Sequence, residues 1–180
     1  MFEVPPNTEK YVSVKDAILE VWRFDIAPGS DGKEFIYRIS DLEYKSDFYN
    51  QFFRPPTALL TDVTTRYLAG SGLFMDVLSP TSQGGNTNYY IEGNIVRLYG
   101  DYRTQPKAVM EIQLFLLKYE SDITDGGISN IVFGKTYSSE KPIASASAQD
   151  LMRGWNLALE EILNEFLADL SGKVNQKPGI

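Results

Sequence analysis

The side chains that most often perform chemistry near neutral pH are missing from this sequence. Its 180 residues contain neither Cys nor His. Without thiol and imidazole groups, the chain cannot form disulfides, Cys-type metal sites, or a Ser-His-Asp or Cys-His catalytic arrangement. The remaining options are carboxylate, Lys or Tyr chemistry, or a metal ion held by oxygen ligands alone.

Acidic residues could supply such carboxylates in two places, one within a short stretch and one on or beside two neighbouring strands. The first set is Asp41, Glu43 and Asp47, and the second is Glu92, Asp101 and Glu111. A convergent pair would suit glycoside hydrolysis, and a convergent cluster would suit a hard cation. The spacing matches no ligand loop, and solvated charges at turns and sheet edges explain both sets more simply. We therefore expect no catalytic, cofactor-binding or metal-binding residue, and a carboxylate-dependent hydrolase remains a minor hypothesis.

Aromatic residues are dense in the same part of the chain. Four of them fall within residues 47–53, which is more than a core of this size requires. Tyr is favoured where an apolar ring must end in a polar contact. Core and loop packing is one interpretation, and a surface for a partner or a second subunit is the other. The candidate partner or subunit surface consists of Tyr37, Tyr44, Asp47, Tyr49, Phe52 and Phe53.

The charge balance opposes one class of partner. The 24 acidic and 17 basic residues give a formal net charge of -7. A net negative charge is repelled by a phosphate backbone. We expect no nucleic-acid partner.

Hydrophobic periodicity predicts the first half of the fold. Residues 17–26 alternate with both faces largely apolar, which is typical of an interior strand. Short strands at 35–39 and 42–45 form a predicted hairpin. Apolar residues at three- and four-residue steps over 59–68 predict a helix that ends at the Gly70-Ser71-Gly72 segment.

The second half of the chain reads as a short strand at 73–78, three long strands and a helix. Two of the long strands cover 89–102 and 108–116, and Ile131, Phe133 and Tyr137 mark the third. Within the first of these, the apolar face changes sides, which indicates a bulge or burial on both faces near Gly93. The final helix follows Ser147, with Asp150 in a capping-box position, and ends at Gly172.

These elements predict an α+β fold, with a single mixed, mostly antiparallel sheet packed by two main helices. We expect one domain over residues 15–172. Residues 1–14, with Pro5-Pro6, are expected to be the remnant of a flexible tether, and residues 173–180 a loose C-terminal tail.

A series of short motifs spans about residues 17–170. In chain order these are Phe35–Arg38, Glu43-Tyr44, Asp47–Phe52, Ser71–Phe74, Ile91–Gly93, Leu98–Asp101 and Gly154-Trp155. Together they resemble the ABC-type transport auxiliary lipoprotein family, the MCE-associated group that includes paraquat-inducible protein C.

The resemblance implies a non-catalytic domain in the periplasm, tethered to the outer membrane by an acylated N-terminal Cys. It implies partners, namely an MCE-domain protein and an ABC permease and ATPase complex, that move lipids or hydrophobic solutes across the bacterial envelope. It also implies a fold similar to anticodon-binding-like and TolB amino-terminal domains, and relatives that assemble into homo-oligomeric rings. Because this sequence contains no Cys, the lipid anchor is expected to lie outside it.

One alternative from another functional class stays open. A soluble carrier could bind an apolar ligand between the sheet and the helices, with the Tyr-rich segment as the mouth of the site.

Overall fold

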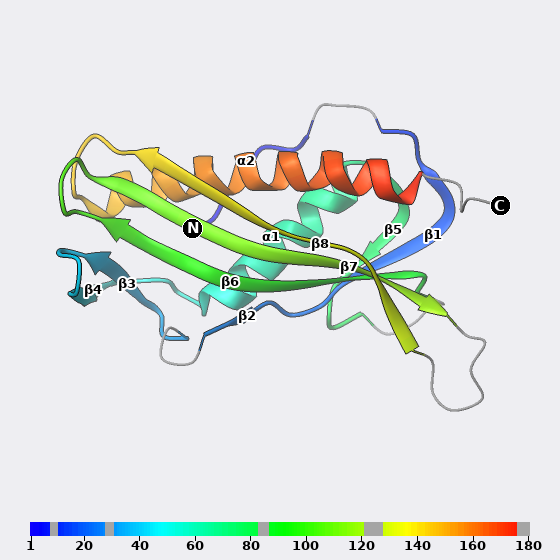
Figure 1. Cartoon of the computed structure of the whole chain (residues 1–180), viewed down its shortest axis with the longest axis horizontal. Coiled ribbons are helices and arrows are strands. Elements are labelled where there is room, and N and C mark those ends of the chain that lie inside the picture. Colours follow the sequence, from blue (N-terminus) through cyan, green and yellow to red (C-terminus); the bar gives the residue numbers. More distant parts are fainter. Residues whose placement is uncertain (8–10, 28–30, 83–86, 121–127, 176–180) are drawn as a thin grey trace.

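The computed structural model describes residues 1–7, 11–27, 31–82, 87–120 and 128–175. Along these residues, eight strands form one mixed sheet and two helices pack on it. Both helices lie behind the long strands in Figure 1, so the face of those strands toward the viewer carries no helix of the described part of the chain. This arrangement confirms the α+β fold with a mixed sheet and two helices.

The long strands form an antiparallel ladder. Strand β6 (Tyr89–Asp101) pairs with β7 (Lys107–Glu120), which pairs with β8 (Ile128–Pro142). The ladder between β6 and β7 contains a bulge at Val96, between Ile95 and Arg97. The extra residue moves Ile95 and Leu98 to the same face of the sheet, which explains why the apolar pattern changes sides in the sequence.

The short strands occupy the other edge of β6. Strands β1 (Val14–Val21), β2 (Asp25–Ile26) and β3 (Glu34–Arg38) pair with it in succession and in parallel. The single strand predicted over 17–26 is therefore two strands.

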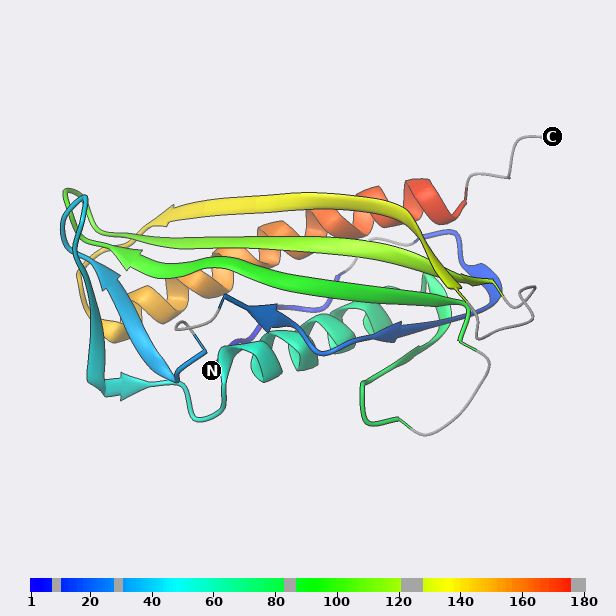
Figure 2. The ribbon, with the colours of Figure 1, turned by 60° about the horizontal axis from the view of Figure 1, so that its bottom comes forward.

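Two further strands pair with the outer sides of β3 and β1. Strand β4 (Tyr44–Gln51) pairs antiparallel with β3, and β5 (Phe74–Leu78) pairs in parallel with β1. Figure 2 shows the hairpin of β3 and β4 at one end of the sheet and β1 toward the other.

Local signals in the sequence set the helix boundaries. Helix α1 (Pro56–Gly70) has Pro in its first turn, where a missing N–H costs nothing. Just after it, Gly72 adopts a φ of 67°, a left-handed conformation that favours glycine. Helix α2 (Ala148–Val174) is capped by Ser147, whose hydroxyl accepts a hydrogen bond from the Asp150 N–H at 3.1 Å. It continues two residues beyond Gly172, so the predicted end was early, and residues 176–180 of the predicted tail lie outside the described residues.

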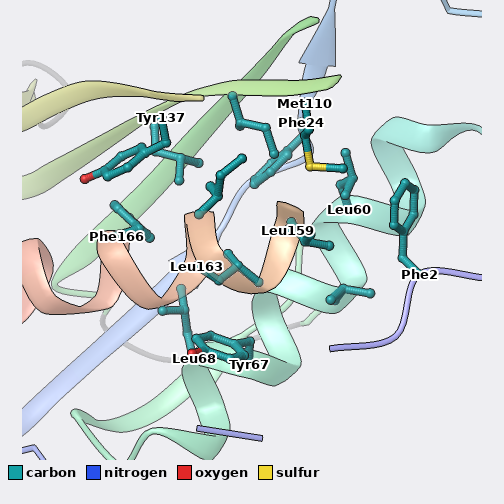
Figure 3. Close-up of a cluster of buried hydrophobic side chains, with 14 of the residues drawn as sticks. Phe2, Phe24, Leu60, Tyr67, Leu68, Met110, Tyr137, Leu159, Leu163 and Phe166 are labelled. Carbon is teal, nitrogen blue, oxygen red and sulfur yellow. The ribbon is translucent and has the colours of Figure 1, made fainter. Parts of the chain in front are cut away.

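The core fills the layer between the sheet and the helices. Alternate residues of β7 from Ala108 to Leu116 are buried there, and the indole N–H of Trp155 on α2 donates to the Val109 carbonyl at 3.2 Å. Figure 3 shows side chains such as Met110, Leu159 and Leu60 meeting from the sheet, α2 and α1. The chain's own side chains thus pack where the carrier hypothesis places its ligand.

The N-terminal residues contribute to this core. The Phe2 side chain is fully buried and stacks on Phe52 with 5.5 Å between ring centroids. The Glu3 N–H donates to the side-chain carbonyl of Asn156 on α2 at 3.1 Å. The first residues therefore pack against the rest of the protein and do not form a free segment. The division of the chain into tether, domain and tail stays a prediction.

Candidate functional site: an aromatic bulge on strand β4

An irregularity in the β3–β4 pairing lifts part of β4 out of the sheet. Phe35 pairs with Asp47, but the next pair joins Glu34 to Gln51. The intervening residues of β4 have no counterpart on β3 and therefore bulge outward. We call them the β4 bulge, which consists of Phe48, Tyr49 and Asn50.

The Asp47 carboxylate holds the β4 bulge in place. Its Oδ1 accepts the backbone N–H groups of Tyr49 at 2.9 Å and of Asn50 at 3.1 Å. Its Oδ2 accepts the Asn50 side-chain amide and the Tyr37 hydroxyl, each at 2.7 Å. Hydrogen bonds from Asn50 and Tyr37 lower the pKa of Asp47 to about 2. The carboxylate therefore stays ionised, and remains the acceptor of these hydrogen bonds, throughout the physiological pH range.

The bulge presents two aromatic rings to solvent. Phe48 is 78% exposed and Tyr49 is 92% exposed, and their rings meet edge to face at 5.8 Å. Phe53 and Tyr44, from just beyond β4 and from its first residue, are also exposed, at 60% and 51%, and the Tyr44 ring meets Tyr99 edge to face at 5.5 Å. Rigid aromatic side chains offer a large contact area at little cost in side-chain entropy.

Tyr37 supports the surface from below. It is half-buried, and its ring stacks on Tyr102 with 5.0 Å between centroids. Burial, followed by the hydrogen bond to Asp47, raises the pKa of Tyr37, and burial raises the pKa of Tyr102 to about 12. Tyr37 therefore remains a protonated donor to Asp47.

Phe52 does not belong to the exposed surface. It is only 6% exposed and contacts Phe2, Phe35 and Trp155, with ring centroids 4.7–5.6 Å apart. The prediction that Phe52 lies on a partner surface is wrong because the chain beyond the bulge turns its ring toward α2. Phe48 takes its place in the surface although it is absent from the predicted set.

The sequence held a signal for Phe48. Asp47 followed by Asn50 is typical of a turn in which an Asp side chain accepts nearby backbone N–H groups. The side chains between the two residues are then free to point outward.

Five of the six acidic residues singled out from the sequence have basic or phenolic partners, and the exception among the described contacts is Glu92. Arg103 donates to Asp41 at 2.5 Å and to Asp101 at 2.7 Å, which brings these two carboxylates to one guanidinium group. Arg103 lowers the pKa of Asp101 to about 2, and Asp101 is buried. Arg97 pairs with Glu111 across β6 and β7. A carboxylate with a pKa near 2 cannot act as a general acid at neutral pH.

The described residues contain no group of three or more acidic side chains that could hold a metal ion. Of the two helices described, neither is long and apolar enough to cross a membrane.

The fold is similar to that of several solved protein structures. No family model and no curated protein matches the sequence. A crystal structure of a Xanthomonas campestris protein assigned to the DUF330 family is similar, with a TM-score of 0.75, 21% identity, and coverage of 96% of this chain and 94% of that one. An uncharacterized protein has a TM-score of 0.68 at 12% identity, with coverage of 91% and 99%. A hypothetical protein from Chlamydia trachomatis has a TM-score of 0.55 at 11% identity, with coverage of 88% and 98%. The chain therefore shares its fold with these proteins over almost its whole length.

Proposed function

We propose that this protein is a non-catalytic docking module of the bacterial envelope. Its role would be that of an auxiliary component of an MCE-type ABC transport system that moves lipids or hydrophobic solutes. The proposed location is the periplasm, at the outer membrane, with an MCE-domain protein and the permease and ATPase as partners. Assembly of several copies into a ring forms part of the same proposal.

The observation that carries the docking role is the β4 bulge. Two exposed rings sit on a segment that Asp47 holds through two backbone N–H groups and the Asn50 side-chain amide, while the Tyr37 hydroxyl donates to the same carboxylate. Interface residues of this kind, aromatic and already ordered before binding, tend to dominate binding energy. Neither ring packs in the core. A partner that covers both rings best explains why they are held at the surface.

The transport context is supported by the order of the sequence motifs that resemble the auxiliary lipoproteins. Several of these motifs lie in the elements that build the site. Phe35–Arg38 is part of β3, and Asp47–Phe52 contains the Asp47 carboxylate and the β4 bulge. The mixed sheet packed by helices agrees with the kind of fold that the resemblance implies.

A pull-down with the MCE-domain protein encoded in the same genome tests the proposal. The unaltered chain should retain that protein, and a Phe48→Ala/Tyr49→Ala variant should retain at least about tenfold less, as expected for loss of a hot spot. A matched control removes two exposed apolar side chains elsewhere, Tyr119→Ala/Leu157→Ala, and should bind normally. Lack of association with the unaltered chain, or equal binding by the bulge variant, would contradict the proposal.

A further inference from the structure

One edge of β6 is interrupted. On the side opposite β7, β6 pairs with β1 at Tyr89–Ile91, with β2 at Asn94-Ile95 and with β3 at Gly100-Asp101. No described residue pairs with the stretch 96–99 on this side. Figure 2 shows β3 diverging from β6 over this stretch. We call the gap the β6 notch; its walls are Val96, Arg97, Leu98 and Tyr99 on β6 and Glu34 and Ile36 on β3.

A cavity of about 230 Å³ occupies the β6 notch. It touches every residue of β6 from Ile95 to Tyr99. Ile95 and Leu98 lie on the core side of the sheet whereas Val96 is exposed, so a cavity that touches all three reaches both faces and lies against the strand edge itself. The edge offers the backbone N–H and C=O groups that bind an added strand.

The cavity also has an apolar side. Phe52 and Pro56 line it, together with Ile26 and Ile36. Phe52 and Pro56 are buried, so this side continues the protein core. An apolar side chain that bound here would be removed from water, and the packed side chains of the protein would not have to move.

The notch carries one uncompensated charge. The Glu34 carboxylate is half-buried at its rim, and no described residue donates a hydrogen bond to it or forms an ion pair with it. Arg97, the cation that also lines the cavity, is already paired with Glu111. The site therefore favours a positively charged group next to an apolar one.

We propose that the β6 notch binds an extended peptide segment with a Lys or Arg between apolar residues. The peptide backbone would extend the sheet along residues 96–99. Its alternating side chains would place the basic group at Glu34 and the apolar groups against Phe52 and Pro56. This site goes beyond the proposed docking of the β4 bulge and does not depend on it.

The probe is an acetylated and amidated pentapeptide, Thr-Val-Lys-Val-Thr, added to the isotope-labelled full chain and followed by amide chemical shifts. Saturable shifts should centre on residues 96–99. A Thr-Val-Glu-Val-Thr peptide should bind about tenfold more weakly, the loss expected when a charged hydrogen bond is removed. A Thr-Pro-Lys-Pro-Thr peptide, which lacks two N–H donors, should bind more weakly as well. Absence of shifts with the first peptide, or equal affinity for the Glu peptide, would overturn the proposal.

Two variants locate the binding. Glu34→Gln should weaken the Lys peptide about tenfold and remove its advantage over the Glu peptide. Ala27→Phe places a ring in the notch from an exposed position and should abolish binding while the chain remains folded. Unchanged affinity in either variant would overturn the assignment. The Phe48→Ala/Tyr49→Ala variant should bind the peptide normally, so failure of this site and failure of bulge docking give separate results.

Discussion

The Tyr37 hydroxyl donates a 2.7 Å hydrogen bond to Asp47 Oδ2, and this contact joins β3 to the base of the β4 bulge. It ties a half-buried tyrosine to an ionised carboxylate that itself organises the backbone of Tyr49 and Asn50. Exposed rings on the bulge thus depend on a polar network set back from the surface.

Removal of the Asp47 carboxylate should loosen the bulge. Asp47→Ala deletes the acceptor for four hydrogen bonds and should lower the free energy of unfolding by about 1–3 kcal/mol. Tyr37→Phe removes only one of these bonds and should cost about 1 kcal/mol. Urea unfolding measures both values. An Asp47→Ala protein as stable as the unaltered chain would show that the network does not hold the bulge.

Phe48 and Phe52 should respond oppositely to truncation. Phe52→Ala removes a ring packed against three other rings and should cost about 3–5 kcal/mol in the free energy of unfolding. Phe48→Ala removes an exposed ring and should change it by no more than about 0.5 kcal/mol. Thermal and urea unfolding of the two single variants provide the comparison, and similar losses in both would contradict the assigned positions.

Stability should fall in acid through Asp47 and Asp101. Both carboxyl groups have a pKa lowered to about 2 from the ordinary 3.8, so the folded state holds their protons less tightly than the unfolded state. Their contribution is fully present above about pH 4 and is lost as the pH falls toward 2. Urea unfolding from neutral pH down to this range should show the decline, and an Asp47→Asn/Asp101→Asn variant should show a shallower one. An equal slope in the variant would assign the acid sensitivity to other groups.

Gly93 should not tolerate a side chain. A Cβ at this position would lie 2.4 Å from the ring of Phe24, which is itself buried. Gly93→Ala should therefore cost about 1–3 kcal/mol through overpacking.

Gly172 provides the matched control. It lies within α2, and no side chain or other segment of the described residues comes within 4 Å of the place that a Cβ would take, so Gly172→Ala should be neutral or stabilising by up to about 1 kcal/mol. Calorimetric melting temperatures would distinguish the two positions, and a neutral Gly93→Ala would contradict the close contact with Phe24.

The amino-acid sequence by itself determined the elements that depend on neighbours along the chain. Alternation in β7, the apolar stripe and Ser147 cap of α2, and the glycines at and just after the end of α1 are all local patterns, and each predicts an element present in the structure. Even the bulge in β6 left a trace, because an extra residue shifts the apolar face at Val96.

Tertiary structure decided which side chains are buried and which strand edges have no partner among the described residues. Phe48 and Phe52 are both aromatic and lie close together in the chain, yet the β3–β4 register sends one to solvent and the other to Trp155. Arg103 reaches Asp41, 62 residues away along the chain, only because β3 and β6 are neighbours. The β6 notch likewise exists because β2 and β3 pair with β6 at separate positions. Pairing between distant segments sets these features, and no periodicity within a single segment encodes it.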